Sequence, residues 1–148
     1  MPIRFAPSPG TMLLCDYAIG GFRPPEMVKR RPAVVISPRL RHRDGLCTVV
    51  PLSTTPPAQD VPYVVHVRLA APLPAPFDAL EMWAKCDMVA TVGFCRLDLF
   101  RTGRDAAGRR KYLQPKLGRA DFERIQRGVL TGLGLLHLTF NQTASHSG

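Results

Sequence analysis

Residues 31–54 read RPAVVISPRLRHRDGLCTVVPLST, in which two apolar runs flank a basic turn. The runs, residues 33–37 and 46–50, are short and rich in valine, leucine and isoleucine, which is typical of buried β-strands. A proline ends the first run, and hydroxyl side chains followed by Pro56-Pro57 end the second. The segment therefore predicts two strands separated by a turn over residues 39–45, with hydroxyls at the end of the second strand.

Outside this segment, 15 prolines and 12 glycines break the 148 residues into short pieces, most of them rich in β-forming side chains. This pattern predicts a small, mainly β protein of the barrel type. Further strands are expected at residues 12–19, 63–69, 79–84 and 88–94, the last two being either separate strands or one strand bent at residues 85–87. Residues 101–111 are expected to form a basic turn between the arms of a hairpin.

One helix is predicted near the end of the chain, over residues 121–136, with Asp121 as its N-cap. Its apolar face would consist of Phe122, Ile125, Val129, Leu133 and Leu136, which recur at helical spacing. Gly128, Gly132 and Gly134 each cost about 1 kcal/mol relative to alanine, so packing must stabilise this helix, and another element could approach it closely. Residues 1–140 are expected to form one domain, and the polar tail 141–148 is expected to be disordered.

The chain carries 20 Lys and Arg against 11 Asp and Glu, a formal charge of +9. This charge favours a polyanionic partner with nucleic acid as the leading class, although a solvated basic surface or a site for an acidic protein would have the same composition. No apolar run is long enough to span a membrane, and the N-terminal residues do not resemble a signal peptide. We expect a cytoplasmic protein.

The four cysteines lie in apolar segments without any C-x-x-C pair; they are Cys15, Cys47, Cys86 and Cys95. Zinc sites usually combine such pairs with nearby histidines, and disulfides are rare in the cytosol. The cysteines are therefore interpreted as reduced core thiols, and neither a metal nor a cofactor is expected.

Several motifs occur in a fixed order along the chain. The strand Met12-Leu13-Leu14-Cys15-Asp16-Tyr17 comes first, Glu26 stands five residues before the Arg31-Pro32 strand, and Val49-Val50-Pro51-Leu52-Ser53-Thr54 follows. Residues 83–92, WAKCDMVATV, form a basic-x-Asp element, and a helix comes last. In this order and spacing, residues 10–136 resemble the MazF/PemK family of toxins from type II toxin-antitoxin systems.

The resemblance implies an SH3-like β-barrel with a C-terminal helix, assembled as a homodimer. It also implies a metal-independent endoribonuclease that cuts single-stranded RNA, including messenger RNA, and is inhibited by an antitoxin whose acidic segment occupies the RNA groove. The chain departs from compact members of the family in a longer basic hairpin over residues 101–117 and in a first loop that reads Phe22-Arg23-Pro24-Pro25.

Metal-free RNA cleavage uses the substrate's own 2′-OH as nucleophile, so the protein must assist proton transfer and stabilise charge on the phosphate. Arg31 is the expected catalytic cation, because its guanidinium suits phosphate oxygens. Ser53 and Thr54 are expected to donate hydrogen bonds to the same phosphate, although both hydroxyls could instead cap a turn.

Lys85 and Asp87 stand two apart on an expected strand, so they would either form a structural ion pair or act together in the cleft. The resemblance implies an acid–base role for the equivalent residues in part of the family. Glu26 is interpreted as a base or, preferably, as a residue that holds Arg31. Expected substrate-binding residues are Glu26, Arg30, Arg39 and His42.

Two other functions are compatible with the sequence. The barrel also resembles the CcdB group, which poisons DNA gyrase without cutting RNA, and fold alone does not decide function. A second alternative is an inactive relative that binds RNA or an antitoxin. Arg31 with Ser53 and Thr54, together with the charge of +9, favours RNA cleavage.

Overall fold

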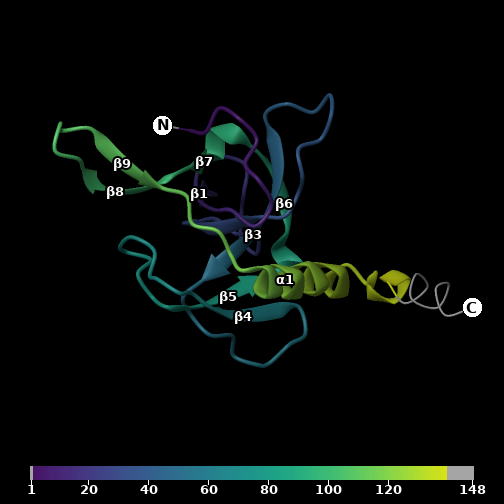
Figure 1. Cartoon of the computed structure of the whole chain (residues 1–148). Helices are drawn as coiled ribbons and strands as arrows, with labels where there is room; N and C mark the ends of the chain where they lie inside the picture. Colours follow the sequence, from purple (N-terminus) through teal and green to yellow (C-terminus); the bar gives the residue numbers. More distant parts are fainter. Residues whose placement is uncertain (1, 140–148) are drawn as a thin grey trace, which may run out of the picture.

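The computed structural model describes residues 2–139 (Figure 1). Its strands are β1 (Met12–Asp16), β2 (Arg30–Val35), β3 (Leu46–Ser53), β4 (Val64–Arg68), β5 (Glu81–Lys85), β6 (Ala90–Gly93), β7 (Leu97–Asp98), β8 (Phe100–Arg104) and β9 (Arg110–Leu113). The helices are α1 (Arg119–Gly132) and the short 3-10 turns η1 (Cys86–Met88), η2 (Phe94–Arg96) and η3 (Leu136–Thr139). The expected class, mainly β with a C-terminal helix, is confirmed. The tail predicted to be disordered lies outside the described residues.

The main sheet is antiparallel, with strand order β4-β5-β3-β2-β1-β7 and β6 as an additional partner of β3. The long strand β3 pairs with β6 from Leu46 to Val49 and with β5 at Leu52 and Ser53. This change of partner splits the sheet along β3. Among the described residues β4 and β7 do not pair with each other, so the expected barrel is open at that seam.

Apolar side chains cover both faces of the central strands. Val34, Val50 and Leu52 belong to one buried cluster, whereas Ala33 and Val35 belong to a second. Because successive side chains of a strand point to opposite faces, a strand buried on both sides reads as an unbroken apolar run. This double burial explains the two runs at residues 33–37 and 46–50.

Helix α1 spans Arg119–Gly132, so it begins and ends earlier than the predicted range 121–136. Gly118 is the N-cap residue, and Asp121 lies in the first turn, where its carboxylate pairs with Arg124 at 3.1 Å. The prediction of Asp121 as N-cap was therefore wrong. The predicted helix end was also wrong: Gly134 adopts a left-handed φ of 72°, which stops the helix.

Gly128 brings α1 against the sheet, as the glycine-rich sequence suggested. A Cβ atom at Gly128 would lie 2.7 Å from the Cys86 Sγ and 2.8 Å from the Val65 Cγ2. One turn later, a Cβ at Gly132 would lie 3.3 Å from the Asp87 Cα. The helix therefore fixes the position of η1, and Figure 1 shows it lying beside β4 and β5.

Three of the four cysteines are buried, and Cys95 in η2 is exposed. The core-thiol interpretation is confirmed for Cys15, Cys47 and Cys86 and is wrong for Cys95. Burial raises the pKa of the Cys15 and Cys47 thiols to about 11 and that of Cys86 to about 12. Within residues 2–139 no helix has the length and apolarity needed to cross a membrane.

Candidate functional site

Arg31 and Ser53 lie at the same end of neighbouring strands. The β2–β3 register pairs Ala33 with Pro51, and its continuation by two residues brings Arg31 level with Ser53. Arg31 is also the register partner of Cys15 on β1. Because side chains alternate along a strand, Arg31 and Ser53 point to the same face of the sheet. The two predicted residues are thus brought together.

The guanidinium of Arg31 is incompletely satisfied. The residue is half-buried, and its Nε atom is buried without a hydrogen-bond partner in the described part of the chain. A buried donor without an acceptor costs about 1–3 kcal/mol. An anionic oxygen bound beside Arg31 would remove this cost.

Ser53 is buried, with 2% of its surface exposed. Its Oγ accepts a hydrogen bond from the Thr55 backbone N–H at 3.1 Å and donates to the Thr55 carbonyl oxygen at 3.4 Å. The turn-capping role is therefore present in the structure. The donated bond is the longer of the two. Thr54, in contrast, is exposed in the bend that follows.

Lys85 and Asp87 do not share the face of one strand, so the predicted extended geometry was wrong. Lys85 ends β5 and lies opposite Val64, whereas residues 86–88 turn as η1 because Cys86 packs beneath α1. No ion pair joins Lys85 to Asp87 within residues 2–139. Lys85 is half-buried and Asp87 is exposed.

A cavity of about 460 Å³ lies between η1 and the loop that follows β1. Its lining includes two carboxylates, Glu26 and Asp87, together with the rings of Tyr17 and Phe22. Tyr17 follows β1, which pairs with β2 at Arg31, and Asp87 follows β5, which pairs with β3 at Ser53. Two residues that line the cavity therefore follow strands that are paired with the strands of Arg31 and Ser53.

Glu26 supports its own loop. Its Oε1 accepts a hydrogen bond from the Arg23 backbone N–H at 3.3 Å, and its own N–H donates to the Arg23 carbonyl at 2.8 Å. Among the described residues it forms no ion pair with Arg31. The ion pair through which Glu26 was expected to hold Arg31 is therefore not formed between these two residues.

The same loop depends on Arg96, which the sequence analysis missed. Its guanidinium donates to the carbonyl oxygens of Asp16, Ile19 and Gly20 at 3.1, 2.6 and 2.8 Å and lies 4.6 Å from the centroid of the Phe22 ring. The available signal was a single arginine within the apolar residues 92–99. Arg96 fixes the loop that forms one wall of the cavity.

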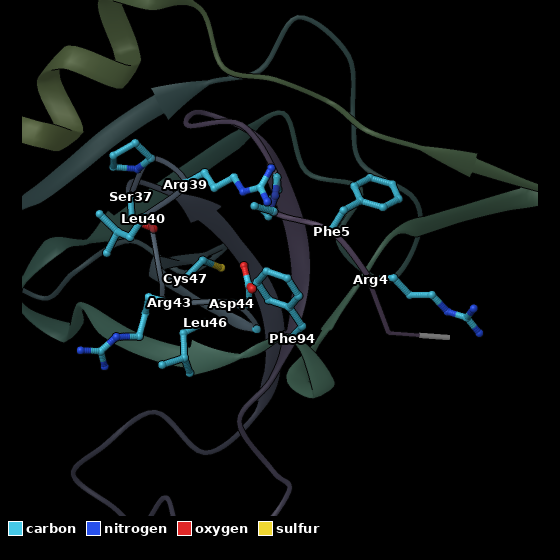
Figure 2. A pocket seen from close by; sticks show the side chains of 14 residues that line it. Arg4, Phe5, Ser37, Arg39, Leu40, Arg43, Asp44, Leu46, Cys47 and Phe94 are labelled. Atoms are coloured by element: carbon cyan, nitrogen blue, oxygen red, sulfur yellow. The ribbon is translucent and has the colours of Figure 1, made fainter.

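The other expected substrate-binding residues do not share the face of the sheet on which Arg31 lies, or lie at the other end of β2. Arg30 points to the opposite face of β2 and pairs with Asp98 at 3.9 Å. Arg39 and His42 belong to the loop after β2, at the far end of a strand that rises about 3.3 Å per residue. Arg39 lines a different cavity, of about 470 Å³, which is shown in Figure 2. Arg31 and Arg39 therefore lie at opposite ends of β2, and Arg39 lines a cavity that does not include Arg31.

The comparison with protein families matches residues 8–129 to the PemK-like, MazF-like toxins of type II toxin-antitoxin systems. The chain belongs to this family. The resemblance drawn from the motifs is thereby confirmed. In the part of the chain that the structure describes, no group of three or more His, Cys, Asp or Glu side chains is arranged to hold a metal ion.

Relatives and solved structures extend this result. The Escherichia coli (strain K12) protein YifN, itself uncharacterised, is 31% identical over 93% of this chain and 99% of its own length. A mycobacterial endoribonuclease, solved with its cognate antitoxin, is 24% identical over 88% of this chain and 97% of that chain, with a TM-score of 0.55. MazF from Deinococcus radiodurans is 18% identical over 88% and 98%, with a TM-score of 0.56. At these identities the two structures support the fold.

Proposed function

We propose that this family member is an endoribonuclease toxin that cleaves single-stranded RNA, such as messenger RNA, without a metal. The observation that carries the proposal is the buried Nε of Arg31, which has no hydrogen-bond partner among residues 2–139, on a residue level with Ser53. Family membership and the endoribonuclease activity named for a structural neighbour support the same reaction. The formal charge of +9 suits an RNA substrate better than a protein target.

In the proposed reaction the substrate's 2′-oxygen attacks the adjacent phosphorus and the bond to the 5′-oxygen breaks. The products are a 2′,3′-cyclic phosphate and a 5′-OH. Arg31 stabilises the charge that develops on the phosphate oxygens, and Ser53 or Thr54 donates a neutral hydrogen bond to the same group.

The proton from the 2′-OH needs an acceptor, and the departing 5′-oxygen needs a donor. Asp87 and Glu26 are the carboxylates that line the neighbouring cavity, and we assign Asp87 the role of base. Lys85, half-buried at the end of β5, is assigned as the acid.

The proposal includes two protein partners. Leu133, Leu135 and Leu138 are 55%, 39% and 53% exposed beyond α1, an apolar area that a second copy of the chain would cover in a homodimer. A cognate antitoxin would inhibit the protein by placing an acidic segment over its basic groove. We place this activity in the cytoplasm, where the RNA substrate is found.

Incubation of the purified protein with a long single-stranded RNA in EDTA tests the proposal. Discrete fragments with cyclic phosphate and 5′-OH ends are expected, and they should form far more slowly with Arg31→Ala. Intact RNA that is tightly bound would identify an inactive relative. Intact RNA combined with inhibition of DNA gyrase would identify a CcdB-like poison.

A further inference from the structure

Three segments border one surface of the molecule: residues 2–9, the loop 36–45 and the hairpin β8–β9. In Figure 1 the N-terminal segment lies in the upper part of the view, between the hairpin, which projects to the left, and the blue loop 36–45 at the upper right. Cavities of about 470 and 500 Å³ lie on this surface, and residues 4–7 line both. The first extends to the loop and the second to Tyr112 on β9. The two cavities therefore border one continuous strip.

Residues 4–7 are anchored on both sides. The Ile3 N–H donates to the Leu97 carbonyl at 3.0 Å, and the Gly10 N–H donates to the Val35 carbonyl at 2.7 Å. Phe5 lies between these anchors with 71% of its surface exposed. Its ring is thus presented to solvent from a segment tied to the sheet.

Aromatic rings and arginines both line this strip, together with one carboxylate, that of Asp44. Phe94 lines the first cavity, Phe5 lines both, and Tyr112, 45% exposed, lines the second. Figure 2 shows Arg39 extending toward the segment that carries Phe5, and the Phe94 ring beside the Asp44 carboxylate. Exposed rings between fixed cations bind single-stranded nucleic acid, because bases stack on the rings and phosphates approach the cations.

The hairpin extends this strip with further positive charge. Arg104 on β8 and Arg110 on β9 are directly opposite in the register, and like charges in this arrangement repel. The Arg104 guanidinium donates one hydrogen bond to the Gly108 carbonyl oxygen at 2.8 Å. The nearby Asp105 carboxylate accepts hydrogen bonds from the Ala107 and Arg109 backbone N–H groups, each at 2.9 Å, so it serves the turn. Within residues 2–139 no carboxylate forms an ion pair with Arg109 or Arg110.

We propose that this strip, from Phe94 and Arg39 across Phe5 to Tyr112 and Arg110, binds single-stranded RNA outside the cavity that Glu26 and Asp87 line. Unpaired bases would enter the two cavities, whose volumes are in the range of small-ligand sites. Phosphates would lie against Arg39 and between Arg104 and Arg110. The choice of RNA rests on the proposed function; the stacking surface rests on the geometry described above.

Fluorescence anisotropy with a labelled 20-nucleotide RNA tests the strip, with Arg31→Ala as the parent protein so that binding is measured without cleavage. Phe5→Ala should weaken binding about ten-fold through loss of one stacked base. Arg39→Ala combined with Arg110→Ala should lower the slope of log affinity against log salt by about 1.4, at about 0.7 per phosphate contact. Arg127→Ala removes one exposed charge from α1 and should leave both quantities unchanged.

Circular dichroism melts verify that each variant is folded. Affinities for RNA equal to that of the parent in all strip variants would overturn the inference, even if the wild-type protein cleaves RNA as proposed. Weaker binding in the strip variants would support the strip even if wild-type cleavage failed. The same variants are tested for binding to a poly-glutamate peptide. If the parent binds this peptide and the strip variants lose that binding while their RNA affinity is unchanged, the strip serves an acidic protein. The inference would then be wrong.

Discussion

Gly128 on α1 lies so close to Cys86 that a Cβ atom would come within 2.7 Å of the cysteine Sγ. The contact joins α1 to η1, the turn that carries Asp87 into the cavity between η1 and the loop after β1. Packing at this one glycine therefore positions part of the proposed site.

Gly128→Ala should destabilise the protein by up to about 2 kcal/mol. The added methyl group overpacks the contact with Cys86 and Val65 at a cost of about 1–3 kcal/mol, and the better helix propensity of alanine offsets about 1 kcal/mol of this. Urea unfolding measures this change. Gly20→Ala is the matched control, since a Cβ at Gly20 meets no atom within 4 Å, and it should stay within about 0.5 kcal/mol of the wild type. Equal effects of the two substitutions would contradict the close approach of α1 to η1.

Arg31→Ala should lower the cleavage rate by a factor of about a thousand or more, because it removes the charge aimed at the developing oxyanion. Single-turnover kinetics on a defined RNA measure the rate. Arg30→Ala is the control for charge alone, since Arg30 points to the opposite face and pairs with Asp98. A similar loss in both variants would reduce Arg31 to one member of a basic patch.

Ser53→Ala should be less severe than Arg31→Ala, about a hundred-fold in rate, because a neutral donor is removed. It should also cost about 1 kcal/mol of stability, since Ser53 caps the turn at Thr55. Ser53→Thr keeps the hydroxyl and should recover most of the rate. Recovery of stability without recovery of rate would assign Ser53 to the turn alone.

Arg96→Ala should loosen the loop between β1 and β2 by removing three hydrogen bonds to carbonyl oxygens. Faster hydrogen exchange over residues 18–23 is the expected readout. Arg96→Lys should not rescue protection, because one ammonium group cannot reproduce the planar guanidinium fork. Unchanged exchange in Arg96→Ala would show that the loop is held by other contacts.

One thiol, Cys95, should react rapidly with a disulfide reagent at pH 8, and Cys15, Cys47 and Cys86 should react only on unfolding. Burial raises the pKa of these three thiols to about 11, 11 and 12 in the folded state. Thiols of the unfolded chain ionise first, so stability should fall as the pH rises above about 9. Rapid reaction of all four thiols in the native protein would contradict their burial.

The sequence predicted those features that depend on local patterns. The runs at residues 33–37 and 46–50 indicated central strands. Arg31 comes before the first run and Ser53 after the second, which indicated that the two side chains act on the same phosphate. It failed where tertiary contacts decide the structure. The turn at Cys86 depends on packing against Gly128, the helix end depends on the conformation of Gly134, and the three carbonyls that Arg96 contacts are about 80 residues away in sequence.

The central claim is that Arg31 assists attack by the RNA's own 2′-OH, and a single 2′-deoxy substitution tests it most directly. The wild-type protein, in EDTA, is given a defined RNA and the same RNA with a deoxy sugar at the mapped cut. Cleavage of the first with a 2′,3′-cyclic phosphate product, and no cleavage of the second at that position, is the predicted result. Cleavage of the deoxy substrate at the same position would show that the nucleophile comes from elsewhere, and the proposed mechanism would be wrong.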